Sequence, residues 1–117
     1  MTPDEFREIA LSFAGAIESA HMNHPDFRAN GRIFATLSYP DTKTAMVKLA
    51  MADQQRLIAA HPHIFYPAQG AWGLQGSTMI HLDAAKPDLM TQALDLAWQY
   101  SAATTAAKKP KKKAGRV

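Results

Sequence analysis

The stretch that decides the fold is His24-Pro25-Asp26-Phe27-Arg28-Ala29-Asn30-Gly31-Arg32-Ile33-Phe34-Ala35-Thr36-Leu37. It predicts a strand, a tight turn and a second strand, because Asn30-Gly31 accepts the two positive-φ positions of a type I′ turn, whose twist matches that of the strands. Arg28 precedes this turn and Arg32 follows it. The stretch therefore predicts a β-ribbon with a basic tip, which is one of the shapes that grip a nucleic-acid groove.

The segments on either side of the ribbon predict further helices and strands. Thr2-Pro3-Asp4-Glu5 combines a capping box with a proline suited to the first helical position, so a helix begins here, and Gly15 ends it. Apolar residues recur at helical spacing in the last segment before the tail. Further strands are expected at 17–22, 44–49, 64–66 and 78–82, a loop at 67–76, and further helices at 52–61 and 87–103.

These elements define the fold class. The order is helix, about three strands, helix, two strands and helix. Strands joined by short turns imply a mostly antiparallel sheet, and helices gathered on one face give a two-layer α+β sandwich. With 117 residues of which 47% are hydrophobic, the chain suits one domain, expected over residues 1–103.

The net charge of +3 hides a division between body and tail. Residues 1–107 carry a net charge of −3, whereas residues 108–117 carry +6. No apolar residue lies between Ala107 and Ala114, so residues 104–117 are expected to form a disordered, Lys-rich tail. Such a tail neutralises phosphates and releases counterions, or else simply keeps the protein in solution. Its cations are Lys108, Lys109, Lys111, Lys112, Lys113 and Arg116.

The composition also excludes several classes of protein. The chain has no cysteine, hence no disulfide framework and no thiol nucleophile. It has no long apolar run, and its acidic start is unlike a signal peptide. A cytoplasmic monomer that does not enter the membrane is expected.

Several short motifs along the body carry a family resemblance. They are His24-Pro25-Asp26-Phe27-Arg28, Gly31-Arg32-Ile33-Phe34-Ala35-Thr36-Leu37, Val47-Lys48-Leu49, Tyr66-Pro67, Gly70-Ala71-Trp72-Gly73 and Ala97-Trp98. In this order and spacing the chain resembles the MmcQ/YjbR family of small bacterial proteins over residues 4–103. The resemblance implies a compact α+β fold and DNA binding through a double-wing arrangement of β-hairpins, and it brings no catalytic motif. The chain departs from the family at Ser77, where many members carry an aromatic residue.

The candidate binding residues lie in the ribbon, in the turns and in a glycine-rich loop. Arg28, Asn30, Arg32, Lys43 and Lys48 are candidate nucleic-acid contacts on one ribbon-lined face, although exposed charges also serve solubility. Trp72 lies in the loop with Gly70, Gly73 and Gly76. Its ring either stacks on a base or folds back to plug the end of the sheet.

Catalytic and metal sites are not expected. The five histidines match no standard zinc spacing, and no cysteine assists them. The chain has no G-x-S-x-G or H-E-x-x-H motif, so no enzymatic activity and no cofactor are predicted. The sequence favours a nucleic-acid-binding protein of low specificity, most simply a DNA-binding one. The alternatives are a protein-interaction or chaperone-like module and a small-ligand binder that uses the Trp72 loop.

Overall fold

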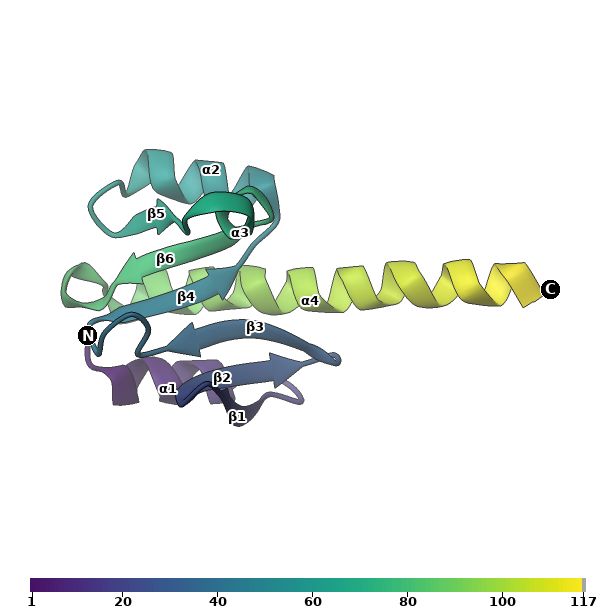
Figure 1. The fold of residues 1–117 in the computed structure, drawn as a ribbon, viewed down its shortest axis with the longest axis horizontal. Coiled ribbons are helices and arrows are strands. Elements are labelled where there is room, and N and C mark those ends of the chain that lie inside the picture. The colour runs from purple at the N-terminus through teal and green to yellow at the C-terminus, as the bar shows by residue number, and fades with distance from the viewer. Residues whose placement is uncertain (117) are drawn as a thin grey trace.

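The computed structural model of the chain describes the backbone of residues 1–116 and the side chains of residues 1–104. A six-stranded sheet forms one layer and helices cover one of its faces (Figure 1). In chain order the elements are α1 (Pro3–Leu11), β1 (Ile17–His21), β2 (His24–Ala29), β3 (Arg32–Leu37), β4 (Thr44–Lys48), α2 (Met51–Ala60), β5 (Phe65–Pro67), α3 (Gly70–Leu74), β6 (Ser77–His81), the 3₁₀ helix η1 (Leu82–Ala84) and α4 (Pro87–Arg116).

The strands lie in the order β1-β2-β3-β4-β6-β5, and all neighbouring pairs are antiparallel. The predicted α+β class with a mostly antiparallel sheet is thus confirmed. Two details differ from the expected order. Four strands rather than three precede α2, and part of the expected loop at 67–76 is the short helix α3.

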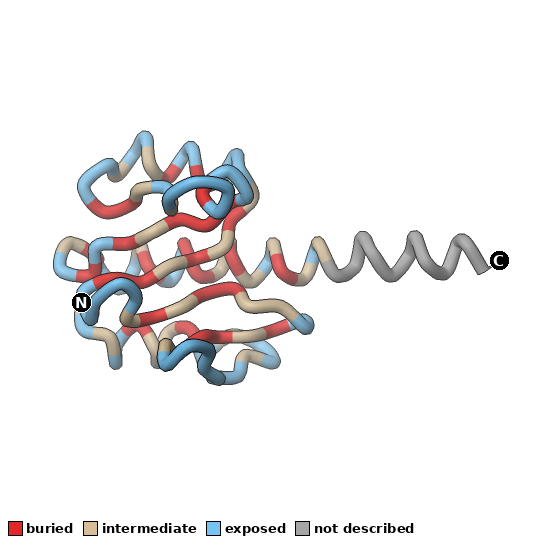
Figure 2. Tube along the Cα trace, in the orientation of Figure 1, coloured by how far each residue is buried: buried red, intermediate tan, exposed pale blue. Residues whose placement is uncertain are grey.

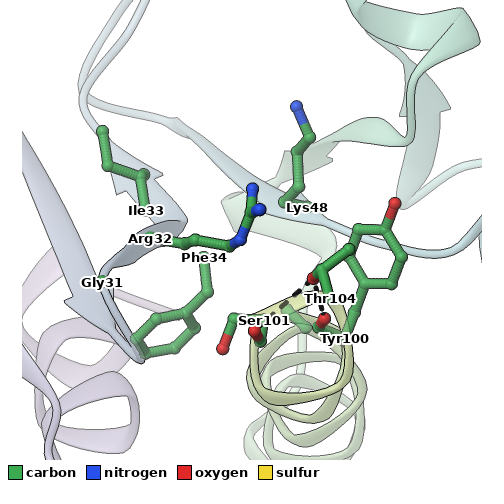
Figure 3. A pocket seen from close by; sticks show the side chains of 9 residues that line it. Gly31, Arg32, Ile33, Phe34, Lys48, Tyr100, Ser101 and Thr104 are labelled. Carbon is green, nitrogen blue, oxygen red and sulfur yellow. Dashed lines mark hydrogen bonds between the residues drawn. The ribbon is translucent and has the colours of Figure 1, made fainter. Parts of the chain in front are cut away.

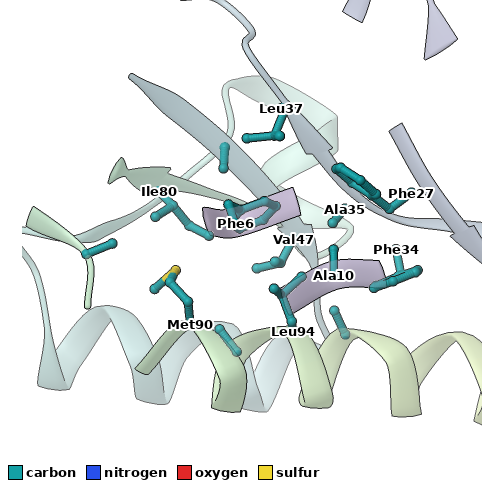
Figure 4. Close-up of a cluster of buried hydrophobic side chains, with 14 of the residues drawn as sticks. Phe6, Ala10, Phe27, Phe34, Ala35, Leu37, Val47, Ile80, Met90 and Leu94 are labelled. Atoms are coloured by element: carbon teal, nitrogen blue, oxygen red, sulfur yellow. The ribbon is translucent and has the colours of Figure 1, made fainter. Parts of the chain in front are cut away.

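The hydrophobic core lies between the sheet and helices α1 and α4 (Figures 1 and 2). In Figure 4, Phe6 and Ala10 of α1 and Met90 and Leu94 of α4 meet the apolar face of the strands. That face carries buried Phe27, Ala35, Leu37, Val47 and Ile80. The spacing of Met90, Ala93, Leu94 and Ala97 places these four residues on one side of α4, which explains why they are buried together.

A β-bulge interrupts the pairing of β2 with β3. Phe27 lies opposite Ala35, but the next residue, Arg28, lies opposite Ile33, so Phe34 is an extra residue in β3. Phe34 and Ala35 are both completely buried, although they are adjacent in a strand. An extra residue of this kind reverses the facing of the residues beyond it. Arg32 therefore lies on the helix-covered side of the sheet.

The turns explain how the first three strands are joined. Asn30 and Gly31 have φ angles of 57° and 74°, which confirms the predicted positive-φ turn between β2 and β3. Met22 and Asn23 have φ angles of 51° and 67° and close a second hairpin between β1 and β2. The predicted capping box at Thr2 and Glu5 is also present, and α1 ends at Leu11, before Gly15.

The predicted disorder of residues 104–117 is not tested. Thr104 lies on α4, and residues 105–117 lie outside the part of the chain whose side chains are described. Within the described residues, no helix has the length and apolar character needed to cross a membrane.

Gly76 should be hard to replace, because a Cβ atom there would lie 1.9 Å from the Leu49 carbonyl oxygen and its φ is +103°. The two backbone segments are also joined by a hydrogen bond of 2.9 Å, in which the Leu49 N–H donates to the Gly76 carbonyl oxygen. Gly76→Ala is expected to lower the free energy of unfolding by about 3 kcal/mol or more, measured by urea denaturation.

Gly31→Ala is the matched control for this experiment, because Gly31 also has a positive φ but has no atom within 4 Å of the added Cβ. It should cost only the left-handed backbone penalty of about 1–2 kcal/mol. Equal losses for the two variants would contradict the steric explanation.

Candidate functional site

A groove with basic walls lies where β3 begins and β4 ends, against α4 (Figure 3). Its volume is about 370 Å³. We call it the basic groove, and its lining residues are Gly31, Arg32, Ile33, Phe34, Lys48, Ala97, Tyr100, Ser101 and Thr104. Arg32 and Lys48, both predicted from the sequence as binding residues, line the same groove.

Three elements position the walls of the groove. The bulge at Phe34 turns Arg32 to the α4 side of the sheet. Lys48 is the last residue of β4. Tyr100 and Thr104 are four residues apart on α4 and so lie on one face of the helix. In Figure 3 the Tyr100 ring and the Arg32 guanidinium flank the space beside Lys48.

The cations of the groove lack acidic partners. Among the described residues, neither Arg32 nor Lys48 makes an ion pair, whereas Arg7, Arg28 and Arg56 each bind a carboxylate. Two uncompensated positive charges in one partly enclosed space attract an anion, and low-dielectric walls strengthen that attraction. The groove is therefore suited to a phosphate or a similar anion.

Asn30 attaches the tip of the hairpin to α4. Its Nδ2 donates a hydrogen bond to the Ser101 Oγ at 3.0 Å, and that hydroxyl donates to the Trp98 carbonyl oxygen at 2.6 Å. Ser101 is only 3% exposed. Asn30, proposed from the sequence as a contact residue, thus has a structural role at the end of the basic groove.

Arg28 does not belong to the groove, contrary to the predicted single face. It lies opposite Ile33 on the far side of the sheet, where its Nε and Nη2 contact the Asp26 carboxylate at 2.7 and 3.0 Å. The His21 Nδ1 lies 2.7 Å from the same carboxylate. Hydrogen bonds from Arg28, and then from His21, hold the pKa of Asp26 below its usual range despite its burial.

The remaining predicted contacts are dispersed. Lys43 precedes β4 at the opposite end from Lys48, and its Nζ lies 3.7 Å from the Asp83 carboxylate. Trp72 lies on α3 and is 66% exposed, so its ring does not plug the end of the sheet. The six tail cations from Lys108 to Arg116 lie outside the residues whose side chains are described.

A second hollow of about 410 Å³ was not anticipated from the sequence. We call it the Tyr66–His81 hollow, after two rings that stack with centroids 4.5 Å apart and planes at 27°. Its lining residues are Pro40, Asp41, Lys43, Thr44, Tyr66, His81, Asp83 and Ala84. Hydrogen bonds from the Thr44 hydroxyl and then the Lys43 N–H lower the pKa of Asp41, so its carboxylate is ionised at neutral pH. No local sequence motif predicts this hollow, because its residues come from distant parts of the chain.

Within residues 1–104, no group of three or more His, Asp or Glu side chains is placed to hold a metal ion.

Comparison with known proteins identifies related sequences and folds. A family model described as YjbR matches residues 11–100. No curated protein matches the chain. The crystal structure of protein DR2400 from Deinococcus radiodurans, described as a DUF419 domain, is similar with a TM-score of 0.70 and 16% identity. The match covers 83% of this chain and 75% of that one, and at this identity it shows a common fold.

The Asp26 cluster predicts a stability that depends on pH. Because the folded-state pKa of Asp26 is lowered, its contribution is present above the ordinary carboxyl pKa of about 4 and is lost as the pH falls through the folded-state value. Asp26→Asn should lower the free energy of unfolding at pH 7 by about 1–3 kcal/mol. Urea denaturation of both proteins over a pH series should show this difference shrinking below about pH 4.

Asp53→Asn provides the comparison, since Asp53 pairs with Arg56 at the surface of α2 at 2.8 Å. That pair should be worth at most about 1 kcal/mol. A gap between wild type and Asp26→Asn that stays constant from pH 7 to pH 3 would rule out the charged form of Asp26 as its source.

Proposed function

The chain belongs to the YjbR family, and we propose that it is a non-enzymatic protein that binds nucleic acid, DNA in the first instance, with low sequence specificity. The basic groove is the fixed part of the binding surface, and the cations of the last ten residues add to it. The proposal places the protein in the cytoplasm as a monomer.

The observation that carries this proposal is the pair of cations in the groove. Arg32 and Lys48 line one space and have no ion-pair partner among the described residues. Tyr100 adds a hydroxyl group to the same walls, whereas the Thr104 hydroxyl donates to the Tyr100 carbonyl oxygen within α4. Arg, Lys and Tyr side chains are among the usual phosphate contacts in nucleic-acid complexes.

The tail supports the same function from the sequence. Thr104 is the last lining residue of the groove, and the first tail cation, Lys108, comes four residues later. Six positive charges in residues 108–117 offset a body that is negative overall. Contacts of this kind are made to phosphates and carry no sequence information, which is why we propose low specificity.

A different surface favours the alternative of protein interaction. Trp72 and Leu74 on α3 are 66% and 77% exposed, and Met51 at the start of α2 is 36% exposed. Exposed large apolar side chains of this kind often mark interaction sites. A protein partner that co-purifies stoichiometrically and is lost in Trp72→Ala would support this alternative, provided that no oligonucleotide binds.

Loss of the groove cations should weaken binding to a fluorescently labelled 20-base-pair duplex or to one of its strands. The double variant Arg32→Ala/Lys48→Ala is expected to lower the steepness of the log–log salt dependence by about 2, because each lost phosphate contact removes about 0.9. Anisotropy titrations from low to moderate salt measure this slope. Lys86→Ala is the matched control, since Lys86 is an exposed cation outside both hollows, and it should bind as wild type does.

Neutralising the tail tests its separate contribution. With all six cations replaced by glutamine, the slope on duplex DNA should fall by about 5 if every charge contacts a phosphate. If the protein without tail cations still binds DNA, and this binding is lost in Arg32→Ala/Lys48→Ala, then the folded body itself binds DNA through the basic groove. Full-chain binding with no salt dependence at low ionic strength would contradict the proposed function.

A further inference from the structure

A row of directly opposed residues crosses all six strands on the face of the sheet that α1 and α4 leave uncovered. The pairing registers connect each member to the next without a break. In spatial order the row is Ser19, Asp26, Thr36, Met46, Met79 and Tyr66. Side chains at directly opposed positions lie on one face about 5 Å apart, so these six form a continuous strip.

The two ends of this strip differ in chemistry. At the β1–β2 end, Asp26 is fully buried and is satisfied by Arg28 and His21. At the other end Met46, Met79 and Tyr66 are half-buried and apolar. In Figure 1, α4 runs behind β4, and among the described elements no helix crosses the near face of β3 and β4. No helix therefore covers the β4 position of the strip, and Met46, Met79 and Tyr66 are each partly exposed.

Each hollow shares a β4 residue with this face, Lys48 for the basic groove and Thr44 for the other, whereas Arg32 and the α4 residues of the basic groove lie on the helix-covered side. Lys48 of the basic groove is two residues from Met46 on β4, on the same face. Thr44 of the Tyr66–His81 hollow is two residues from Met46 in the other direction. Lys48 and Thr44 are thus about 13 Å apart at about 3.3 Å per residue, with Met46 and Met79 between them.

We propose that this open face binds single-stranded nucleic acid, with a phosphate in the basic groove and a base on Met46, Met79 and Tyr66. The proposal rests on the proposed function and deepens it. Bases of a single strand expose flat faces that stack on apolar and aromatic side chains, whereas a duplex hides those faces within its own stack. A strip that continues from an unpaired Lys48 to an aromatic ring fits the first arrangement.

The charges at the two hollows assign the direction of the strand across the sheet. The basic groove holds Arg32 and Lys48 and so takes phosphate. The Tyr66–His81 hollow contains the Asp41 and Asp83 carboxylates and one cation, Lys43, whose Nζ lies 3.7 Å from Asp83, so its negative charges outnumber the positive one and disfavour a phosphate. Carboxylates accept hydrogen bonds from the exocyclic amino groups of bases. The base end of a nucleotide therefore points to Tyr66 and its phosphate points to Lys48.

Affinity for single strands and for duplex tests the proposal on the full-length protein. A labelled single strand of ten deoxyadenosines (dA10) and a labelled 10-base-pair duplex are each titrated with the protein at one low salt concentration. Tyr66→Ala should weaken dA10 binding about fivefold or more, the loss expected for one stacked base, and should leave duplex binding unchanged. Tyr66→Phe keeps the ring and should restore dA10 binding. Trp72→Ala removes an exposed ring on α3 and should have no effect.

A second measurement uses the wild-type protein, so it does not depend on whether Tyr66→Ala folds. The methyl groups of Met46 and Met79, labelled with ¹³C, should move upfield when dA10 is added to the wild-type protein, because a base stacked over them imposes its ring current. Met22, which is 85% exposed in the β1–β2 turn, is the internal control and should stay in place.

The outcomes separate this inference from the proposed function. If Arg32→Ala/Lys48→Ala loses dA10 binding while Tyr66→Ala binds as wild type and the Met46 and Met79 signals do not move, the sheet-face site is wrong and the basic groove stands. Preference for duplex over dA10, or methyl shifts caused by a Leu/Val-rich decapeptide and not by dA10, would also overturn it. If neither nucleic acid binds at low salt, the proposed function itself fails.

Discussion

The bulge at Phe34 is the constraint on which the arrangement of this site depends. In a regular strand, side chains alternate between the two faces, so with Ala35 and Leu37 in the core both Phe34 and Arg32 would lie on the uncovered face. The extra residue places Phe34 and Ala35 both in the core and moves Arg32 to the α4 side. Burial of a whole phenylalanine ring is worth about 2–3 kcal/mol, which is enough to favour the bulged register over a regular one that would expose it. The position of a surface cation is thus decided by the packing of its apolar neighbour.

Local chemistry in the sequence was a reliable guide to local structure. The Asn30-Gly31 turn and the Thr2/Glu5 capping box appear as predicted, because each is decided by a few adjacent residues. The expected helix beginning at Pro87 is present, and Ala93, Leu94 and Ala97 on one side of it are buried. The bulge is different, since nothing in Ile33-Phe34-Ala35 distinguishes it from regular alternation until the partner strand and α4 are in place. Buried Gln54 was missed for the same reason. Its amide nitrogen satisfies Gly73, Ser77 and Thr78, which become neighbours only in the folded chain.

The candidate site shows the same limit. A count of cations found Arg28, Arg32, Lys43 and Lys48 but treated them as one surface. The structure divides them by partner, because Asp26 and Asp83 engage Arg28 and Lys43 and no described acid engages Arg32 or Lys48. Which side chains form ion pairs across a sheet depends on the strand register, and the register cannot be read from a single sequence. The body of this YjbR-family protein thus uses some of its basic residues for its own stability and leaves others available to a ligand.

The strand order has a consequence for how the chain folds. Strands β1 to β4 are consecutive hairpins, so their pairing closes only short loops. The pairing of β4 with β6 is different, because α2, β5 and α3 lie between them in the chain, and the whole of that segment forms the loop that closes when Lys48 pairs with Ser77. Closing that longer loop costs more entropy before any contact repays it. We therefore expect the β1–β4 meander to provide the early scaffold. The half of the sheet that carries Met79 and Tyr66 joins later, as α1 from one end of the chain and α4 from the other close over the same core.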